Sequence, residues 1–150
     1  MGFTSDGIII AGQFNMIPEL DAFLVEWENG SDATKSMFQA LYACLAGLGG
    51  VSLEYKGRPG VSYSLRARHA AQKKRDLFVL VDIIDDDPKA RWLSVCFYAD
   101  LVTDPEGRGD VIPGGLAGDD AYCFDIDDPD AGEVYMIARL QEACGNAATG

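Results

Sequence analysis

The sequence lacks an apolar run long enough to cross a membrane. A spanning helix needs about 20 apolar residues in succession, whereas the apolar stretch 77–84 is already interrupted by Asp82. A secretory signal peptide is not visible either, because the short run Ile8–Ile10 follows Asp6 instead of a basic residue. We therefore expect a cytoplasmic protein without a membrane partner.

Paired cysteine motifs are also missing. Cys44, Cys96, Cys123 and Cys144 are widely separated, and their spacing matches no zinc-ligand pattern. In a cytoplasmic protein such residues are ordinarily buried free thiols. The sequence therefore predicts four free thiols and no metal site.

The common catalytic and cofactor-binding motifs are absent. The glycine-rich stretch 112–120 contains neither GxGxxG nor GKS/T, and the chain has no GxSxG or HExxH. His69 is the only histidine, and nothing in the sequence positions a partner beside it. The acids of 125–133 lack the glycine and glutamate of a calcium loop at their sixth and twelfth positions. We expect no catalytic residue and no cofactor, although this absence does not exclude an enzyme.

Basic residues are scarce and unevenly placed. The chain has 12 Lys and Arg against 24 Asp and Glu, which gives a net charge of −12. This charge argues against nucleic acid and anionic membranes as partners and is compatible with a protein partner that has a basic surface. Most of the basic residues fall in one short stretch, namely Lys56, Arg58, Arg66, Arg68, Lys73, Lys74 and Arg75.

The clearest pattern is the alternation of apolar and polar residues over 51–68. A period of two is typical of a strand with one buried face and one hydrated face. We expect a β-hairpin with a loop over 56–60, in which Tyr55 pairs with Val61 and Leu53 with Tyr63. The apolar face is then formed by Val51, Leu53, Tyr55, Val61, Tyr63 and Leu65.

The rest of this chain of 150 residues fits one α+β domain. Apolar spacing predicts helices over 18–28 and 32–48, strands over 77–84, 92–102 and 121–126, and a last helix that opens with the acids and proline of 127–130. Residues 1–16 are expected to form an ordered arm or short strand, 103–120 a long loop, and 145–150 a frayed tail. The expected architecture is an antiparallel sheet of about five strands with N-terminal and C-terminal helices packed on it.

A second apolar face emerges from the two middle strands and needs a cover. It comprises Phe78, Leu80, Trp92, Cys96 and Tyr98. Either the first helix or a second copy of the chain could supply that cover, and a two-fold dimer is the commonest oligomer. The leading hypothesis is therefore a non-enzymatic binding or protein-interaction module that forms a homodimer through these residues.

The alternative hypothesis is a small-molecule-binding protein or an enzyme that acts on an anionic ligand, which the basic stretch would hold. Arg forks suit phosphate and carboxylate, and the loop 103–120 could act as a lid over Arg66 and Arg68. The anion-binding residues would be Ser62, Ser64, Arg66, Arg68, Lys73, Lys74 and Arg75. The competing interpretation is a hydrated sheet face followed by a charged turn.

The order of elements resembles that of the small YdhG-like domains of unknown function. The resemblance lies in a helix that leads through Leu48-Gly49-Gly50 into VSYSLRAR, then LFVLV, then WLSVCFY, then a terminal helix, over about residues 35–145. It implies a frataxin-like α+β fold and no established reaction. The long loop and the additional first helix depart from that plan.

Overall fold

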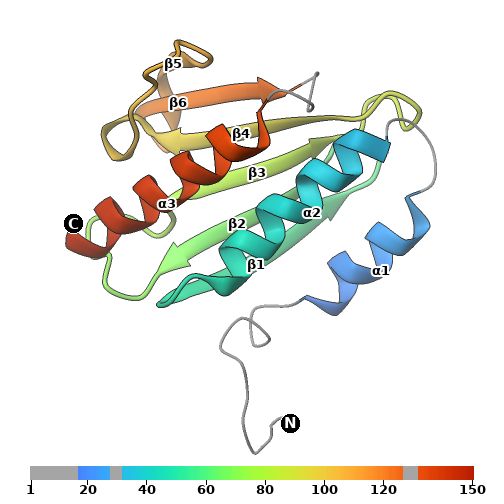
Figure 1. The fold of residues 1–150 in the computed structure, drawn as a ribbon, viewed down its shortest axis with the longest axis horizontal. Coiled ribbons are helices and arrows are strands. Elements are labelled where there is room, and N and C mark those ends of the chain that lie inside the picture. Colours follow the sequence, from blue (N-terminus) through green and yellow to red (C-terminus); the bar gives the residue numbers. More distant parts are fainter. Residues whose placement is uncertain (1–16, 28–31, 127–131) are drawn as a thin grey trace, which may run out of the picture.

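The computed structural model describes residues 17–27, 32–126 and 132–150, which form an α+β fold (Figure 1). The expected helices are present as α1 Pro18–Glu26, α2 Asp32–Gly47 and α3 Glu133–Thr149. The strands are β1 Val51–Arg58, β2 Ser62–His69, β3 Val79–Ile84, β4 Trp92–Tyr98, β5 Asp110–Leu116 and β6 Asp119–Ile126, with a short 3-10 helix η2 Ala99–Leu101 after β4. The predicted fold class is confirmed.

The sheet is antiparallel throughout and has the order β1-β2-β3-β4-β6-β5. It has six strands in place of about five, because part of the expected loop 103–120 is β5. β5 folds back on β6 through Ala117 and Gly118, whose φ angles of 52° and 90° both lie in the left-handed region. Two such residues in succession are typical of a tight hairpin turn. β5 therefore becomes an edge strand at the far side of the sheet from β1.

The first hairpin has its predicted faces but a different register. Tyr55 pairs with Leu65 and Leu53 with Ala67, so the expected pairs with Val61 and Tyr63 are wrong. The loop consists only of residues 59–61, and Gly60 takes a φ of +83° there. Val61 is consequently a turn residue that is 57% exposed. The partner of each residue is displaced by four positions. Because this displacement is even, every side chain within the two strands stays on its predicted face.

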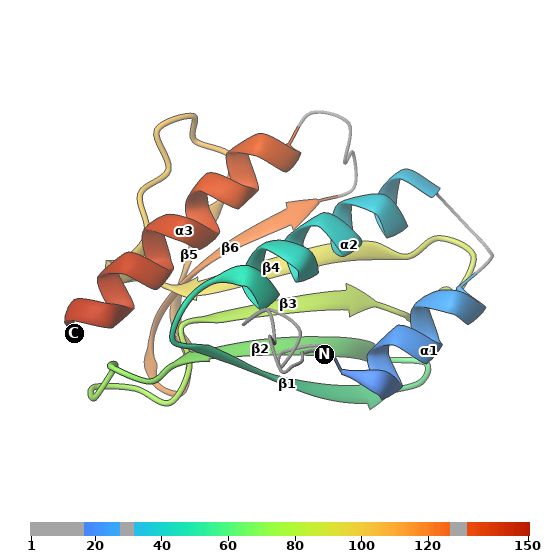
Figure 2. The ribbon, with the colours of Figure 1, turned by 60° about the horizontal axis from the view of Figure 1, so that its bottom comes forward.

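All three described helices lie on one side of the sheet (Figure 2). The core forms between this side and the helices, and its central residues are fully buried: Leu41 and Leu45 of α2, Leu140 of α3, Leu65 of β2, Val81 of β3, and Val95 and Phe97 of β4. These residues recur at every second position in the strands and at helical spacing in α2, which is why the sequence pattern identified them.

α1 joins the helical layer through aromatic side chains. The ring of Phe23 stacks on that of Tyr63 with the centroids 4.0 Å apart. The Arg91 guanidinium lies 5.1 Å from the Phe23 ring centroid and 5.4 Å from that of Trp27. Arg91 also donates from Nε to Asp85 at 2.6 Å. α1 thus covers the same face of the sheet as α2, and not the second apolar face for which the sequence offered it.

The C-terminal residues are helical instead of the expected frayed tail. α3 continues through Thr149, and Ala147 is fully buried, so residues 145–149 belong to the helix. The predictions for residues 1–16 and 127–130 lie outside the described residues. Among the described helices, none combines the length and the apolar character that a membrane span requires.

Candidate functional site: an uncovered sheet face

The candidate site is the side of the sheet opposite the helices, here called the uncovered face. None of the described helices lies on this side (Figure 2). The strand register assigns to it Ser52, Glu54, Lys56 and Arg58 of β1, Ser62, Ser64, Arg66 and Arg68 of β2, Leu80, Asp82 and Ile84 of β3, Trp92, Ser94, Cys96 and Tyr98 of β4, Ala121, Cys123 and Asp125 of β6, and Asp110 and Ile112 of β5.

The register aligns these residues in rows that cross the sheet. One row runs through Glu54, Arg66, Leu80, Cys96, Cys123 and Asp110. The next row runs through Lys56, Ser64, Asp82, Ser94 and Asp125. The first row has Leu80 and the two cysteines at its centre, whereas the second row has the polar pair Asp82 and Ser94 there, and both rows end on an acid.

The predicted interface residues have three different environments. Leu80, Trp92 and Cys96 are half-buried on the two middle strands of the uncovered face. Tyr98 is only 5% exposed, and the Arg75 guanidinium lies 4.0 Å from its ring centroid. Phe78 precedes β3 and is fully buried in the core, so it offers no surface to a partner. The accessible apolar surface is thus formed by Leu80, Trp92 and the neighbouring Ile84 on the middle strands, and by Ile112 on the edge strand β5.

Two of the four cysteines form a disulfide at the centre of the uncovered face. Cys96 of β4 and Cys123 of β6 are directly paired across the strands, with their Cα atoms 4.2 Å apart. The expectation of four free thiols is therefore wrong for these two. Cys44 and Cys144 are free, and burial raises the pKa of both thiols.

Asp82 is the only acid on the central strands β3 and β4 of this face. Burial raises the pKa of its carboxyl, while a hydrogen bond from Ser64 and the charges of Arg66 and Arg58 oppose that rise. Arg66 in turn donates from Nε to Ser64 Oγ at 3.3 Å. Within the described part of the chain, Asp82 Oδ1 is buried without a hydrogen-bond partner. A buried acceptor of this kind is costly.

The predicted anion-binding residues do not form one site. Ser62, Ser64, Arg66 and Arg68 share the uncovered face of β2, as expected from their spacing. Lys73, Lys74 and Arg75 lie instead in the connection between β2 and β3, where Lys73 is exposed. The proposed lid is also distant, because β3, β4 and β6 lie between β2 and β5.

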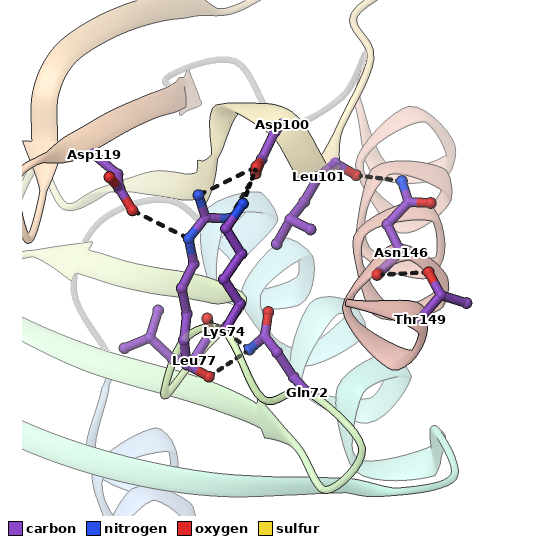
Figure 3. A network of polar contacts seen from close by, with 9 residues as sticks. Gln72, Lys74, Leu77, Asp100, Leu101, Asp119, Asn146 and Thr149 are labelled. Carbon is purple, nitrogen blue, oxygen red and sulfur yellow. Dashed lines mark hydrogen bonds and ion pairs between the residues drawn. The ribbon is translucent and has the colours of Figure 1, made fainter.

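Several of these cations already contact carboxylates. Arg68 forms an ion pair with Glu54 at 3.1 Å. The guanidinium of Arg75 contacts Asp100 at 2.6 Å and Asp119 at 3.2 Å (Figure 3). Lys74 reaches the same Asp100 at 3.4 Å. These carboxylates occupy the positions that a bound anion would need.

The Arg75 cluster joins three segments that are distant in sequence. Asp100 belongs to η2 and Asp119 to the start of β6, so one guanidinium links both to the β2–β3 connection. The hydrogen bond from Arg75 lowers the pKa of the Asp100 carboxyl, and the same contact raises the pKa of Arg75. A surface cavity of about 360 Å³ adjoins these residues. Arg75 thus connects the β2–β3 connection to η2 and to the start of β6 at one end of the sheet.

Sequence reasoning missed Asp82, Asp100, Asp119 and the cysteine pair. Asp82 was visible as the one charge within an apolar run, a position where a buried acid is unusual. The partners of Arg75 and the pairing of Cys96 with Cys123 depend on the strand order β4-β6-β5, for which no local signal exists.

Comparisons with protein-family models, with curated proteins and with solved structures found no match to this chain. The resemblance to YdhG-like domains therefore stays a prediction, and the functional argument depends on the geometry of the uncovered face.

Proposed function

We propose that this protein is a protein-interaction module that forms a homodimer through its uncovered sheet face, and that its role is binding and not catalysis. The observation that carries this proposal is a sheet with all described helices on one side, and with Leu80, Ile84 and Trp92 half-buried on the two middle strands of the other side. The helices cover one face of the sheet, and a second copy of the sheet packed on the other face would bury both.

The composition of the face suits a protein partner. Interfaces commonly have an apolar centre with aromatic residues and a polar, charged rim. Here the disulfide lies near the centre and Trp92 at the end of the middle strand β4, whereas Arg58, Arg68 and Asp125 lie on strands to either side. Arg is favoured and Lys disfavoured in such surfaces, and β2 contributes two arginines to this one.

Binding of an anionic ligand is the second candidate function. It is favoured by the common face of Ser62, Ser64, Arg66 and Arg68. It has less support, because Asp82 lies opposite Ser64 in the register and Glu54 already pairs with Arg68. An incoming anion would have to displace or neutralise both carboxylates.

The homodimer is tested by sedimentation equilibrium over a range of protein concentrations. We expect a monomer–dimer equilibrium that Trp92→Glu shifts to the monomer, since a charge at the centre of an interface is strongly unfavourable when it is buried unpaired. Val25→Glu is the matched control, because Val25 is 78% exposed on α1, away from the face. Circular dichroism verifies that both variants are folded. A wild-type protein that stays monomeric at a concentration of about 100 micromolar contradicts the proposal.

A further inference from the structure

The disulfide between Cys96 and Cys123 lies on the uncovered face and not in the core. Both cysteines are partly exposed, whereas Val95 and Phe124, their neighbours along β4 and β6, point to the helical side and are buried. None of the described helices lies on the side of the sheet that carries the bridge (Figure 2). A small thiol in solution can therefore reach the two sulfur atoms, and such access is one of the conditions for thiol–disulfide exchange.

Opening this bridge leaves the strand pairing intact. β4 and β6 are paired over six residue pairs, from Leu93 with Ile126 to Tyr98 with Ala121. The bridge thus joins two strands that their backbones already hold side by side, and after reduction the two thiols remain opposite each other. The pair can pass between the disulfide and the dithiol form without unfolding of the chain.

The two sulfur atoms differ in their hydrogen-bond partners. Ser94 Oγ lies 3.6 Å from Cys96 Sγ, and the hydroxyl is the donor because a disulfide sulfur carries no proton. Such a donor stabilises the negative charge that develops on Cys96 when it leaves as a thiolate. Within the described part of the chain, no comparable donor contacts Cys123 Sγ. Cys96 is therefore the better leaving group of the two.

The approach to the two sulfur atoms also differs. A thiolate attacks a disulfide in line with the S–S bond, so the strand beyond each cysteine flanks the approach. Leu80 of β3 pairs with Cys96 and is half-buried, whereas Asp110 of the edge strand β5 pairs with Cys123 and is exposed. The charge of Asp110 lies near Cys123 whether that sulfur is attacked or leaves, so it slows exchange without selecting a sulfur. The more open approach is the one to Cys123.

We propose that the Cys96–Cys123 bridge is a site of reversible exchange with small thiols of the glutathione type, and that the thiol attacks Cys123. The thiolate sulfur bonds to Cys123 Sγ as the S–S bond breaks, and Cys96 leaves with the electron pair and takes up a proton. A second thiol then attacks the sulfur of the first and releases Cys123 as a thiol. Two small thiols are thereby oxidised to one disulfide, and the bridge is reduced to two thiols.

The exchange site does not depend on the proposed homodimer, but the two compete. The bridge lies near the centre of the uncovered face, so a dimer through this face covers it and only the monomer exchanges. With both proposals, exchange slows as the protein concentration rises through the dissociation constant of the dimer, and Trp92→Glu removes this dependence. A rate that is independent of protein concentration contradicts a homodimer through this face and leaves the exchange site in place.

The test uses the full chain with Cys44→Ala/Cys144→Ala, in which the bridge contains the only two cysteines, beside the wild type. Reduced glutathione at millimolar concentration is added to the protein at low micromolar concentration. Samples are quenched with acid at early times, free thiols are alkylated, and peptide mass spectrometry locates the glutathione. We expect a mixed disulfide mainly on Cys123 with alkylated Cys96, followed by complete reduction within hours. Circular dichroism verifies that the reduced chain is folded.

Three variants test the choice of sulfur. Ser94→Ala should slow exchange about threefold, because only part of a leaving-group effect is expressed in the rate. Ser52→Ala is the matched control on the same face of β1 and should exchange as the parent does. Leu80→Ala should raise the share of glutathione found on Cys96. A folded chain whose bridge resists glutathione for hours contradicts the exchange site. Glutathione mainly on Cys96 in the parent, or an unchanged rate in Ser94→Ala, contradicts the assignment of Cys123 as the attacked sulfur.

Discussion

The two faces of the sheet are built from alternate residues of the same strands, yet their environments differ. On the side of the helices, Leu65, Val81, Val95 and Phe97 are fully buried. On the uncovered face, Leu80, Ile84 and Trp92 are only half-buried, and charged residues lie beside them. The first face has all the apolar cover it needs within the described chain, whereas the second has apolar surface that one layer leaves accessible. The difference indicates a surface that a partner can complete.

Two acids of the same segment show the contrast in its sharpest form. Asp85, just after β3, is 2% exposed, and burial alone would raise the pKa of its carboxyl. Hydrogen bonds from the Gly60 N–H, the Arg91 guanidinium and the Tyr63 hydroxyl outweigh burial and lower that pKa. Asp82, three residues earlier on the uncovered face, has too few partners to do so, and its pKa is raised. Burial stabilises an acid only where donors surround it.

The largest effect is expected from removing the charge of Asp85. Breaking a buried ion pair by changing one partner costs about 3–5 kcal/mol, so Asp85→Asn should lower the free energy of unfolding by that amount. Asp82→Asn should change it by less than about 1 kcal/mol, because the lost hydrogen bond is offset by relief of burying the charge. Urea unfolding at a protein concentration that keeps the chain monomeric measures both.

The pH dependence of the two variants sharpens this comparison. Because the folded-state pKa of Asp85 is lowered, its contribution is present above the unfolded-state pKa of about 3.9 and is lost as pH falls through the folded-state pKa. The raised pKa of Asp82 has the opposite sign: its ionisation is a cost at neutral pH, and the cost disappears on acidification. Equal losses of stability in both variants at neutral pH would contradict the distinction between the faces.

A matched pair of leucines gives the next effect. Leu65 is fully buried on the helical side of β2, and Leu80 is half-buried on the uncovered side of β3. Leu65→Ala should cost about 3 kcal/mol, from lost burial and the cavity that remains. Leu80→Ala should cost about 1 kcal/mol in the monomer, and it should also weaken the dimer, which Leu65→Ala changes only through overall stability. Urea unfolding and sedimentation equilibrium separate the two effects. A Leu80→Ala variant with unchanged association would argue against Leu80 as part of the interface.

The sequence predicts the two faces correctly because side-chain direction in a strand has a period of two. It does not predict how far one strand slides along another, since a slide by an even number of residues preserves both faces. Tyr55 could therefore pair with Val61 or with Leu65 without any change in the apolar pattern, and only the turn at Gly60 decides between them.

The strand β5 could not be predicted from local preference. Pro113, Gly114 and Gly115 all disfavour strands, so the sequence predicts a loop for this segment. It is a strand because its backbone pairs with β6 at the sheet edge, where proline is tolerated. The candidate site follows the same logic: the common face of Ser64 and Arg66 is a local property, whereas their encounter with Asp82 depends on the register between β2 and β3.

The disulfide offers a smaller expected effect than Asp85 or Leu65 and tests the uncovered face alone. Cys96 and Cys123 are separated by 27 residues, and closing a loop of this kind typically stabilises a protein by about 2–4 kcal/mol. Because β4 and β6 are already paired, we expect the lower end, about 2 kcal/mol. Dithiothreitol should therefore lower the free energy of unfolding of the wild type by that amount and leave the Cys96→Ala/Cys123→Ala double variant unchanged. The Cys44→Ala/Cys144→Ala variant is the control on the helical side, since both of its residues are free thiols, and it should respond to dithiothreitol as the wild type does. A wild type that is indifferent to the reductant would show that the bridge adds nothing to the pairing of β4 with β6, and the centre of the uncovered face would then be held by the sheet alone.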